Sequence, residues 1–127
     1  MDESELLMRQ LQKLAAEDSI GKKSDPRYSV YVIEVEKLDP NLECDFYVGS
    51  TGNPVRYRFA QHVPEHKFAA RIFRNSRARA KRLRWDMMLD LPMFHSKEAA
   101  EKGEGLVAKA IHKAGWVVNS DRLEKTE

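Results

Sequence analysis

Apolar and β-branched residues gather in three short stretches that predict strands. The first stretch runs from Arg27 to Val35, the second from Leu42 to Gly49, and the third is Trp116-Val117-Val118. Leu38-Asp39-Pro40-Asn41 lies between the first two, and its Pro and Asn supply turn dihedrals. The first two strands are therefore expected to form a hairpin.

Apolar residues spaced three and four apart predict helices elsewhere in the chain. Residues 3–17 show this pattern, and the following residues 22–26 resemble a linker. Residues 96–114 show it again, and Gly115 ends that helix. The N-terminal helix is expected either to pack on the domain or to mediate self-association.

Two further helices are expected between the second and third strands. Asn53-Pro54 predicts a helix start, with Asn as the cap and Pro at the first helical position, and the helix reaches about His62. After a loop containing Pro64, residues 67–89 predict a basic helix that Pro92 ends.

These elements predict an α+β fold, with a small three-stranded, mostly antiparallel sheet flanked by helices and preceded by an extra N-terminal helix. The length of 127 residues suggests one domain with a small appendage. We divide the chain into an N-terminal helix and linker (1–26), a domain (27–122) and a tail (123–127).

Charge is distributed unevenly along the chain. The net charge is only +2, yet residues 53–85 contain ten basic side chains and one acidic one, and the other parts are mildly acidic. A concentrated cation of this kind indicates a polyanionic partner.

The basic charge is densest in residues 71–85, which contain no acid. Its cations are Arg71, Arg74, Arg77, Arg79, Lys81, Arg82 and Arg84. A solvated helix face is one interpretation, but seven cations without a compensating acid repel one another. Phosphate contact explains them better and predicts binding that weakens steeply with salt.

Other features restrict the class of protein. No run of about 18 apolar residues exists, so no membrane span is expected. The acidic start lacks the pattern of a secretory signal, and the single Cys44 permits no internal disulfide and no cysteine-based zinc site. We therefore expect an intracellular, cytoplasmic protein.

Glu104 interrupts the apolar face of the helix at 96–114. Ala100, Val107, Ala108 and Ile111 lie four before it and three, four and seven after it, so its carboxylate is expected to point inward. A buried carboxylate is costly unless it is paired or binds metal. The alternatives are a metal ligand and an ion pair with a core-facing arginine.

The helix after the second strand carries a second candidate group. Arg58 and His62 are four apart and share one face, whereas Arg56 lies elsewhere on the helix. A solvated basic face is the simpler interpretation. Gly49 and Gly52 precede the helix, however, and let backbone approach a ligand near a helix N-terminus, which favours anions.

Taken together, these residues resemble the GIY-YIG nuclease superfamily. Its first motif corresponds to Ser29-Val30-Tyr31 and its second to Tyr47-Val48-Gly49. The family then places an arginine and a histidine on the next helix, here Arg58 and His62. A metal-binding glutamate follows on a later helix, here Glu104, and an asparagine follows the last strand, here Asn119.

The resemblance covers about residues 28–120 and has departures. Ser29 replaces the first glycine, Val48 replaces isoleucine, and the hairpin between the motifs is slightly long. Ser50 stands where many members have lysine, which removes one phosphate-facing charge. None of these changes removes a group central to the chemistry.

The resemblance implies a metal-dependent endonuclease that hydrolyses phosphodiester bonds in DNA. Glu104 would hold one Mg²⁺, with Mn²⁺ as an alternative, and Arg58 would hold the phosphoryl oxygens. Tyr31, its phenol pKa lowered by metal and cation, or His62 would accept the proton from water, and Tyr47 would position that water or a phosphate oxygen.

The expected nucleic acid is duplex or branched DNA, with RNA left open. Its expected contacts are Gly49, Ser50, Arg56, the seven cations of residues 71–85 and Asn119. The alternatives are a catalytically inactive nucleic-acid-binding module and a nuclease subunit that requires a partner protein. The sequence leaves monomer and homodimer open.

Overall fold

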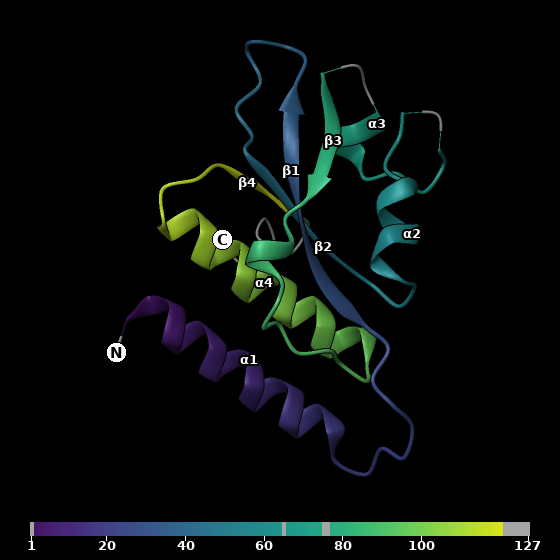
Figure 1. Ribbon diagram of the computed structural model, residues 1–127, viewed down its shortest axis with the longest axis vertical. Helices are drawn as coiled ribbons and strands as arrows, with labels where there is room; N and C mark the ends of the chain where they lie inside the picture. Colours follow the sequence, from purple (N-terminus) through teal and green to yellow (C-terminus); the bar gives the residue numbers. More distant parts are fainter. Residues whose placement is uncertain (1, 65, 75–76, 121–127) are drawn as a thin grey trace.

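The computed structural model describes residues 2–64, 66–74 and 77–120, and it has an α+β fold (Figure 1). Four strands form one sheet in the order β3-β1-β2-β4. They are β1 (Ser29–Lys37), β2 (Phe46–Thr51), β3 (Ala78–Leu83) and β4 (Val118–Asn119). β1 pairs antiparallel with β2 and with β3, whereas β4 runs parallel to β2. The predicted fold class is therefore confirmed, and so is the hairpin.

The helices differ greatly in length. Two have 17 residues each, and the others have three to six. In chain order they are α1 (Glu3–Ser19), α2 (Val55–Ala60), α3 (Arg71–Arg74), the 3₁₀ helix η1 (Trp85–Met87) and α4 (Lys97–Lys113). The last residues of the expected domain and the expected tail at 123–127 lie outside the described residues.

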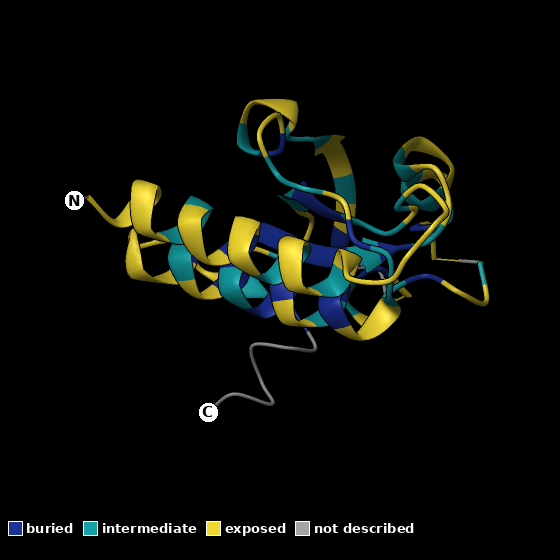
Figure 2. Ribbon diagram, turned by 90° about the horizontal axis from the view of Figure 1, so that it is seen from below, coloured by how far each residue is buried: buried dark blue, intermediate teal, exposed yellow. Residues whose placement is uncertain are grey.

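The sheet separates the helices into two layers because strand side chains alternate between its faces. Val30 points to the α4 side, where a Cβ added at Gly103 would lie 3.4 Å from it. Tyr31 and Tyr47 point to the other side, where Tyr47 packs edge to face on Phe73 of α3. Figure 2 shows the buried strands between these covering elements.

α1 packs lengthwise along α4 (Figure 1) and contributes Leu11, which is 1% exposed, to the core. Its end is tied to the start of α4 by Asp18. That carboxylate accepts the Ser96 hydroxyl at 2.6 Å and the backbone N–H groups of His95 and Ser96. These contacts support packing on the domain as a role for the N-terminal helix.

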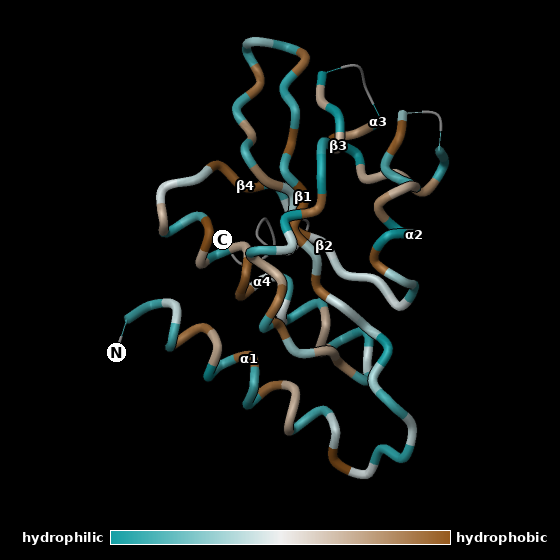
Figure 3. Tube along the Cα trace, in the orientation of Figure 1, coloured by the Kyte–Doolittle hydropathy of each residue, from teal (hydrophilic) through white to brown (hydrophobic). Residues whose placement is uncertain are grey.

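The expected basic helix at 67–89 is wrong, and so is the three-stranded sheet. Residues 78–83 form β3, a largely hydrophilic edge strand (Figure 3), between the short α3 and η1. Ala78 is buried, Arg79 exposed and Ala80 half-buried, so the start of the segment follows the two-residue period of a strand; the period breaks at Lys81 and Arg82, which are both exposed beside a register shift in β1. Across the sheet, Arg79 pairs with Glu36 and Arg82 with Glu34 in the register of β1. The acids of β1 thus supply the counter-charge that an isolated helix would lack.

Other boundaries differ by a few residues. Pro54 is extended, with ψ of 136°, so α2 begins at Val55. Asn53 was expected to cap α2, but its side chain makes no capping hydrogen bond. Its backbone N–H instead donates to Thr51 Oγ1 at 3.0 Å. The last strand is Val118–Asn119, where β2 provides backbone partners.

Candidate functional site

Tyr31, Tyr47 and His62 form an aromatic cluster on the face of the sheet that carries α3. The Tyr31 hydroxyl lies 2.9 Å from His62 Nε2, and Phe73 packs behind Tyr47 and His62. The ring centroids of Tyr47 and His62 are 5.4 Å apart. Tyr31 of β1 and His62, which follows the end of α2 at Ala60, are 31 positions apart in the sequence and are therefore brought into contact by the fold.

His62 is neutral, and its hydrogen bonds fix its tautomer. The Ala70 backbone N–H donates to Nδ1 at 3.0 Å, so Nδ1 is the acceptor nitrogen. The ring proton is therefore on Nε2, which donates to the Tyr31 hydroxyl oxygen. Burial, with the charges of Arg58 and His66, lowers the pKa of His62 to about 3. Both nitrogens are occupied, so His62 orients Tyr31 and has no lone pair for a substrate proton.

Several groups act on the Tyr31 hydroxyl, which is the centre of this cluster. Burial raises the pKa of Tyr31 to about 12, while the charge and hydrogen bond of Arg58 and the hydrogen bond of Tyr47 act in the opposite direction. Burial therefore outweighs the arginine charge. Arg58 and Tyr47 nevertheless stabilise the phenolate: with the same burial and without these two groups, the pKa would be raised further. A phenol pKa lowered by a metal ion and a cation together stays a prediction.

Gly49 leaves the space that this arrangement needs. It pairs directly with Tyr31 across the two strands, and a Cβ added to it would lie 2.5 Å from the Tyr31 hydroxyl oxygen. The same Cβ would lie 3.0 Å from Cε1 of Tyr47. Gly49 is buried and accommodates the two tyrosines. Its expected role in close approach to nucleic acid stays a prediction.

Glu104 lies on the buried face of α4, as the helical pattern predicts, and is 5% exposed. Its Oε1 accepts the Ser50 hydroxyl at 3.0 Å and its Oε2 accepts the Ser120 hydroxyl at 2.7 Å. Ser50 is on β2 and Ser120 directly follows β4, so the carboxylate lies where β4 stops pairing with β2. Its negative charge acts on Tyr31 and raises the pKa of that phenol.

Ser50 has a structural role, and its expected contact with nucleic acid stays a prediction. Its hydroxyl orients Glu104, and by strand alternation Ser50 and Tyr31 lie on opposite faces of the sheet. The carboxylate is adjacent to the aromatic cluster across the β2 backbone. The site thus has a carboxylate side and a tyrosine side, separated by Gly49 and Ser50.

A magnesium ion bound at this site would have Glu104 as its one carboxylate ligand among the residues described above. Mg²⁺ commonly keeps several waters and binds through one or two carboxylates. The two serine hydroxyls fix the orientation of the Glu104 carboxylate, as hydrogen-bond donors commonly do for side chains that bind a metal. Among residues 2–64, 66–74 and 77–120, no group of three or more His, Cys, Asp or Glu side chains could hold a metal ion. A zinc-like site with several protein ligands is thus not found in the described part of the chain.

Arg58 lies between the tyrosine cluster and an open cavity of about 570 Å³. Its Nη1 donates to Gln61 Oε1 at 2.9 Å and to the Phe68 carbonyl at 2.8 Å. These bonds fix the guanidinium, which also interacts with Tyr31. Arg56 instead lies over the Trp85 ring, 5.5 Å from its centroid, which places it away from Arg58 as the helix spacing predicts.

Most cations of the basic stretch have acidic partners. Arg77 pairs with Asp39, Arg79 with Glu36, and Lys81, Arg82 and Arg84 with Glu34; Arg84 also pairs with Asp86. Apart from Asp86 of η1, the partners come from β1 and its following turn, which the order of residues 71–85 does not reveal. The stretch is therefore less basic in space than in sequence.

Arg71 and Asn119 lie near Tyr47. All three line a cavity of about 300 Å³, to which Arg77 and Glu43 also contribute. Arg74 is directed to backbone carbonyls, donating to Ala69 at 2.7 Å and to Lys67 at 3.0 Å. Arg71 makes no ion pair with any residue of the described ranges. Arg71 and Arg77 are the two cations of the stretch that line this cavity, and Arg77 already pairs with Asp39.

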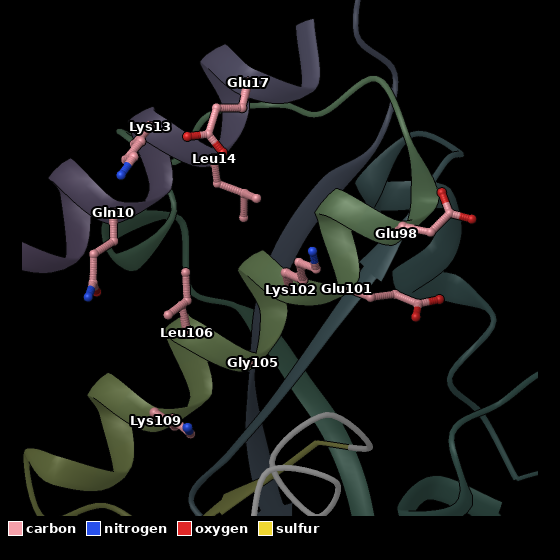
Figure 4. A pocket seen from close by; sticks show the side chains of 10 residues that line it. All are labelled: Gln10, Lys13, Leu14, Glu17, Glu98, Glu101, Lys102, Gly105, Leu106 and Lys109. Carbon is pink, nitrogen blue, oxygen red and sulfur yellow. The ribbon is translucent and has the colours of Figure 1, made fainter.

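A larger cavity, about 670 Å³, lies between α1 and α4 (Figure 4). Leu14, Gly105 and Leu106 contribute to its lining, with charged side chains such as Lys13 and Glu17 around them. It contains none of Tyr31, Tyr47, Arg58, His62 and Glu104. Size therefore does not locate the chemistry in this protein.

Sequence reasoning missed three contributors to the site. Ser120 and Phe73 give no local signal, because their roles depend on α4 and on Tyr47. Ala70 contributes only a backbone N–H, which fixes the His62 tautomer. Such contacts depend on tertiary proximity and have no characteristic residue pattern.

A comparison with protein-family models, curated proteins and solved structures finds no match to this chain. No helix among the described residues is both long enough and apolar enough to cross a bilayer. The function is therefore inferred from the geometry of the site.

Proposed function

We propose that this protein is a divalent-metal-dependent endonuclease that hydrolyses phosphodiester bonds in DNA, of the GIY-YIG type. The observation that carries the proposal is the convergence of Tyr31, Tyr47, Arg58 and His62, from β1, β2 and the α2 region, beside Glu104 of α4. The set consists of a buried acid, a neutral histidine, a cation and two phenols. A hydrophobic core does not need such a combination for its stability.

The residues have complementary roles in this proposal. Arg58 binds two phosphoryl oxygens through its planar guanidinium, which opposes the negative charge that develops there. Tyr47 positions a water or a phosphate oxygen at the same edge of the sheet. Glu104 holds Mg²⁺ (or Mn²⁺), which when bound supplies charge stabilisation at the phosphate and the leaving oxygen.

We assign the general base to Tyr31 and a positioning role to His62. Tyr31 accepts a proton from the attacking water. At the same time the water oxygen bonds to phosphorus, and the bond between phosphorus and the leaving oxygen breaks. Tyr31 must first release its own proton to solvent; Arg58, Tyr47 and His62 favour that release, whereas burial and Glu104 oppose it. His62 does not compete for the role, since Ala70 and Tyr31 occupy its nitrogens.

The test is nicking of supercoiled plasmid by the full chain with Mg²⁺, with Mn²⁺ and with EDTA. Glu104→Gln, Arg58→Ala and Tyr31→Phe are each expected to lower the rate by at least 100-fold, on the order of one catalytic group. Glu98→Gln, an exposed position on α4, is the matched control and should retain the wild-type rate. A wild type that leaves duplex, branched and single-stranded DNA intact, or variants as active as it, would refute the proposal.

A specific observation also favours a binding module without catalysis. Both oxygens of Glu104 accept serine hydroxyls, an arrangement that can also serve structure alone. Under this second proposal, DNA binding falls steeply with salt, no metal-dependent cleavage occurs, and Glu104→Gln changes stability without changing any rate. The nicking assay therefore separates the two proposals.

A further inference from the structure

Two aromatic side chains beside Arg58 take no part in the core. Tyr57 of α2 is 60% exposed, and Phe68 of the loop after α2 is 57% exposed. Both line the cavity of about 570 Å³ that contains Arg58. A single exposed aromatic is ordinary, but two rings around one arginine in one cavity form a surface that requires an explanation.

We propose that this cavity is a stacking subsite for an unpaired nucleobase next to the phosphate held by Arg58. The inference rests on the proposed function for the presence of nucleic acid. Every base has a flat π face that stacks on an aromatic ring, whatever the sequence. The polar side chains of Asn53 and Gln61, which share the lining, can donate to and accept from the edge of the base.

Hydrogen bonds tie the stacking surface to the arginine. Arg58 Nη1 donates to the Phe68 carbonyl at 2.8 Å and to Gln61 Oε1 at 2.9 Å. The guanidinium thus holds the loop that carries one ring, and α2 carries both the arginine and the other ring. The Lys67 ammonium lies over the Phe68 ring, 5.0 Å from its centroid, and adds positive charge there.

The subsite specifies a class of substrate. Bases inside a duplex are stacked on their neighbours and do not present a free face, whereas single strands, flaps and frayed ends do. The favoured substrate is therefore DNA with unpaired nucleotides beside the cleaved phosphate. An intact duplex is the disfavoured one.

The test measures binding in EDTA, so that hydrolysis does not enter. The probe is a six-nucleotide single strand with one 2-aminopurine, whose fluorescence falls on stacking, and a duplex of 12 base pairs is compared with it. Tyr57→Leu and Phe68→Leu keep apolar bulk but remove the π face. Each is expected to weaken single-strand binding about 5- to 100-fold and to restore the fluorescence. Duplex binding should change less than about twofold.

The controls isolate stacking from folding. Tyr57→Phe retains the ring and should bind as the wild type does. Trp116→Leu removes a ring that is 49% exposed outside this cavity and should leave binding unchanged. Circular dichroism verifies that each variant is folded. The variants at Tyr57 and Phe68 are expected to fold, because both rings are exposed.

The outcomes separate this subsite from the proposed activity. Leucine variants that bind like the wild type, equal losses on single strand and duplex, or a wild type that binds neither probe would overturn the subsite. If the subsite is overturned but plasmid nicking requires Mg²⁺ and Glu104, the proposed function stands. Quenching that depends on both rings in a protein that cleaves nothing supports the subsite and refutes the nuclease.

Discussion

Adding one methyl group at Gly49 should disrupt the tyrosine cluster without removing any polar group from it. In Gly49→Ala the new Cβ would lie 2.5 Å from the Tyr31 hydroxyl oxygen and 2.6 Å from its Cζ. Carbon atoms in contact are normally about 3.5–4.0 Å apart, so the ring must move by about 1 Å. Tyr31 is 1% exposed and fixed in the central strand, so the movement meets packed atoms.

The expected cost has two parts. Overpacking a filled core costs about 1–3 kcal/mol. The bond between Tyr31 and His62 is 2.9 Å long, and an added ångström takes it beyond hydrogen-bond length, which costs about 1 kcal/mol more. The free energy of unfolding should therefore fall by about 2–4 kcal/mol, and Tm by roughly 6–20 °C for a chain of this size.

Urea and thermal unfolding, followed by circular dichroism, measure this loss. In a Tyr31→Leu background the clashing Cζ and hydroxyl are absent, so Gly49→Ala should cost less than about 1 kcal/mol there. Gly52→Ala is the matched control, because its Cβ would meet the partly exposed Tyr28 ring at 2.8 Å, which can move aside. Equal losses in the two backgrounds, or a loss below about 0.5 kcal/mol in the first, would refute the steric reasoning.

Three other predictions concern pH, the contact of α1 and the basic surface. The pKa of His62 is about 3 when folded and about 6.5 when unfolded, so stability is lost as pH falls through this range. Urea unfolding at pH 6.5 and 4.5 should show a loss of about 2–3 kcal/mol that His62→Gln lacks; the same pH dependence in both proteins would contradict this. Asp18→Ala should cost about 1–2 kcal/mol in urea unfolding, because it removes three hydrogen bonds at the start of α4, whereas Glu17→Ala should cost under about 0.5. In salt titrations of DNA binding, Arg71→Ala should reduce the slope of log K against log salt concentration by about 1. Arg79→Ala should reduce this slope by less, since Glu36 already neutralises Arg79. The reverse order would show that β3 binds DNA.

The sequence by itself determined the hairpin and the helix that carries Glu104. Runs of β-branched and aromatic residues around Tyr31 and Tyr47 fit strands, and the turn between them closes locally. The stripe from Ala100 to Ile111 gave the orientation of α4, because helical geometry fixes which side chains share a face. Glu104 was consequently predicted to be buried, and it is.

The basic segment shows where local reasoning failed. Arginine and lysine favour helices, yet Ala78, Arg79 and Ala80 also alternate as a strand does. Pairing with Glu34 and Glu36 of β1 favours the strand over a helix for this segment. These two residues lie more than forty positions earlier and face it across the sheet. Propensity is a weak prior, and tertiary pairing overrides it.

Only the tertiary structure decided how the candidate site is assembled. The sequence could supply a histidine, but not the Ala70 N–H that fixes its tautomer, and a tyrosine, but not the burial that raises its pKa. It likewise could not show that Ser50 and Ser120 would hold Glu104. Protonation, orientation and partner choice depend on groups distant in the chain, and their proximity exists only once the sheet and its two helical layers have packed.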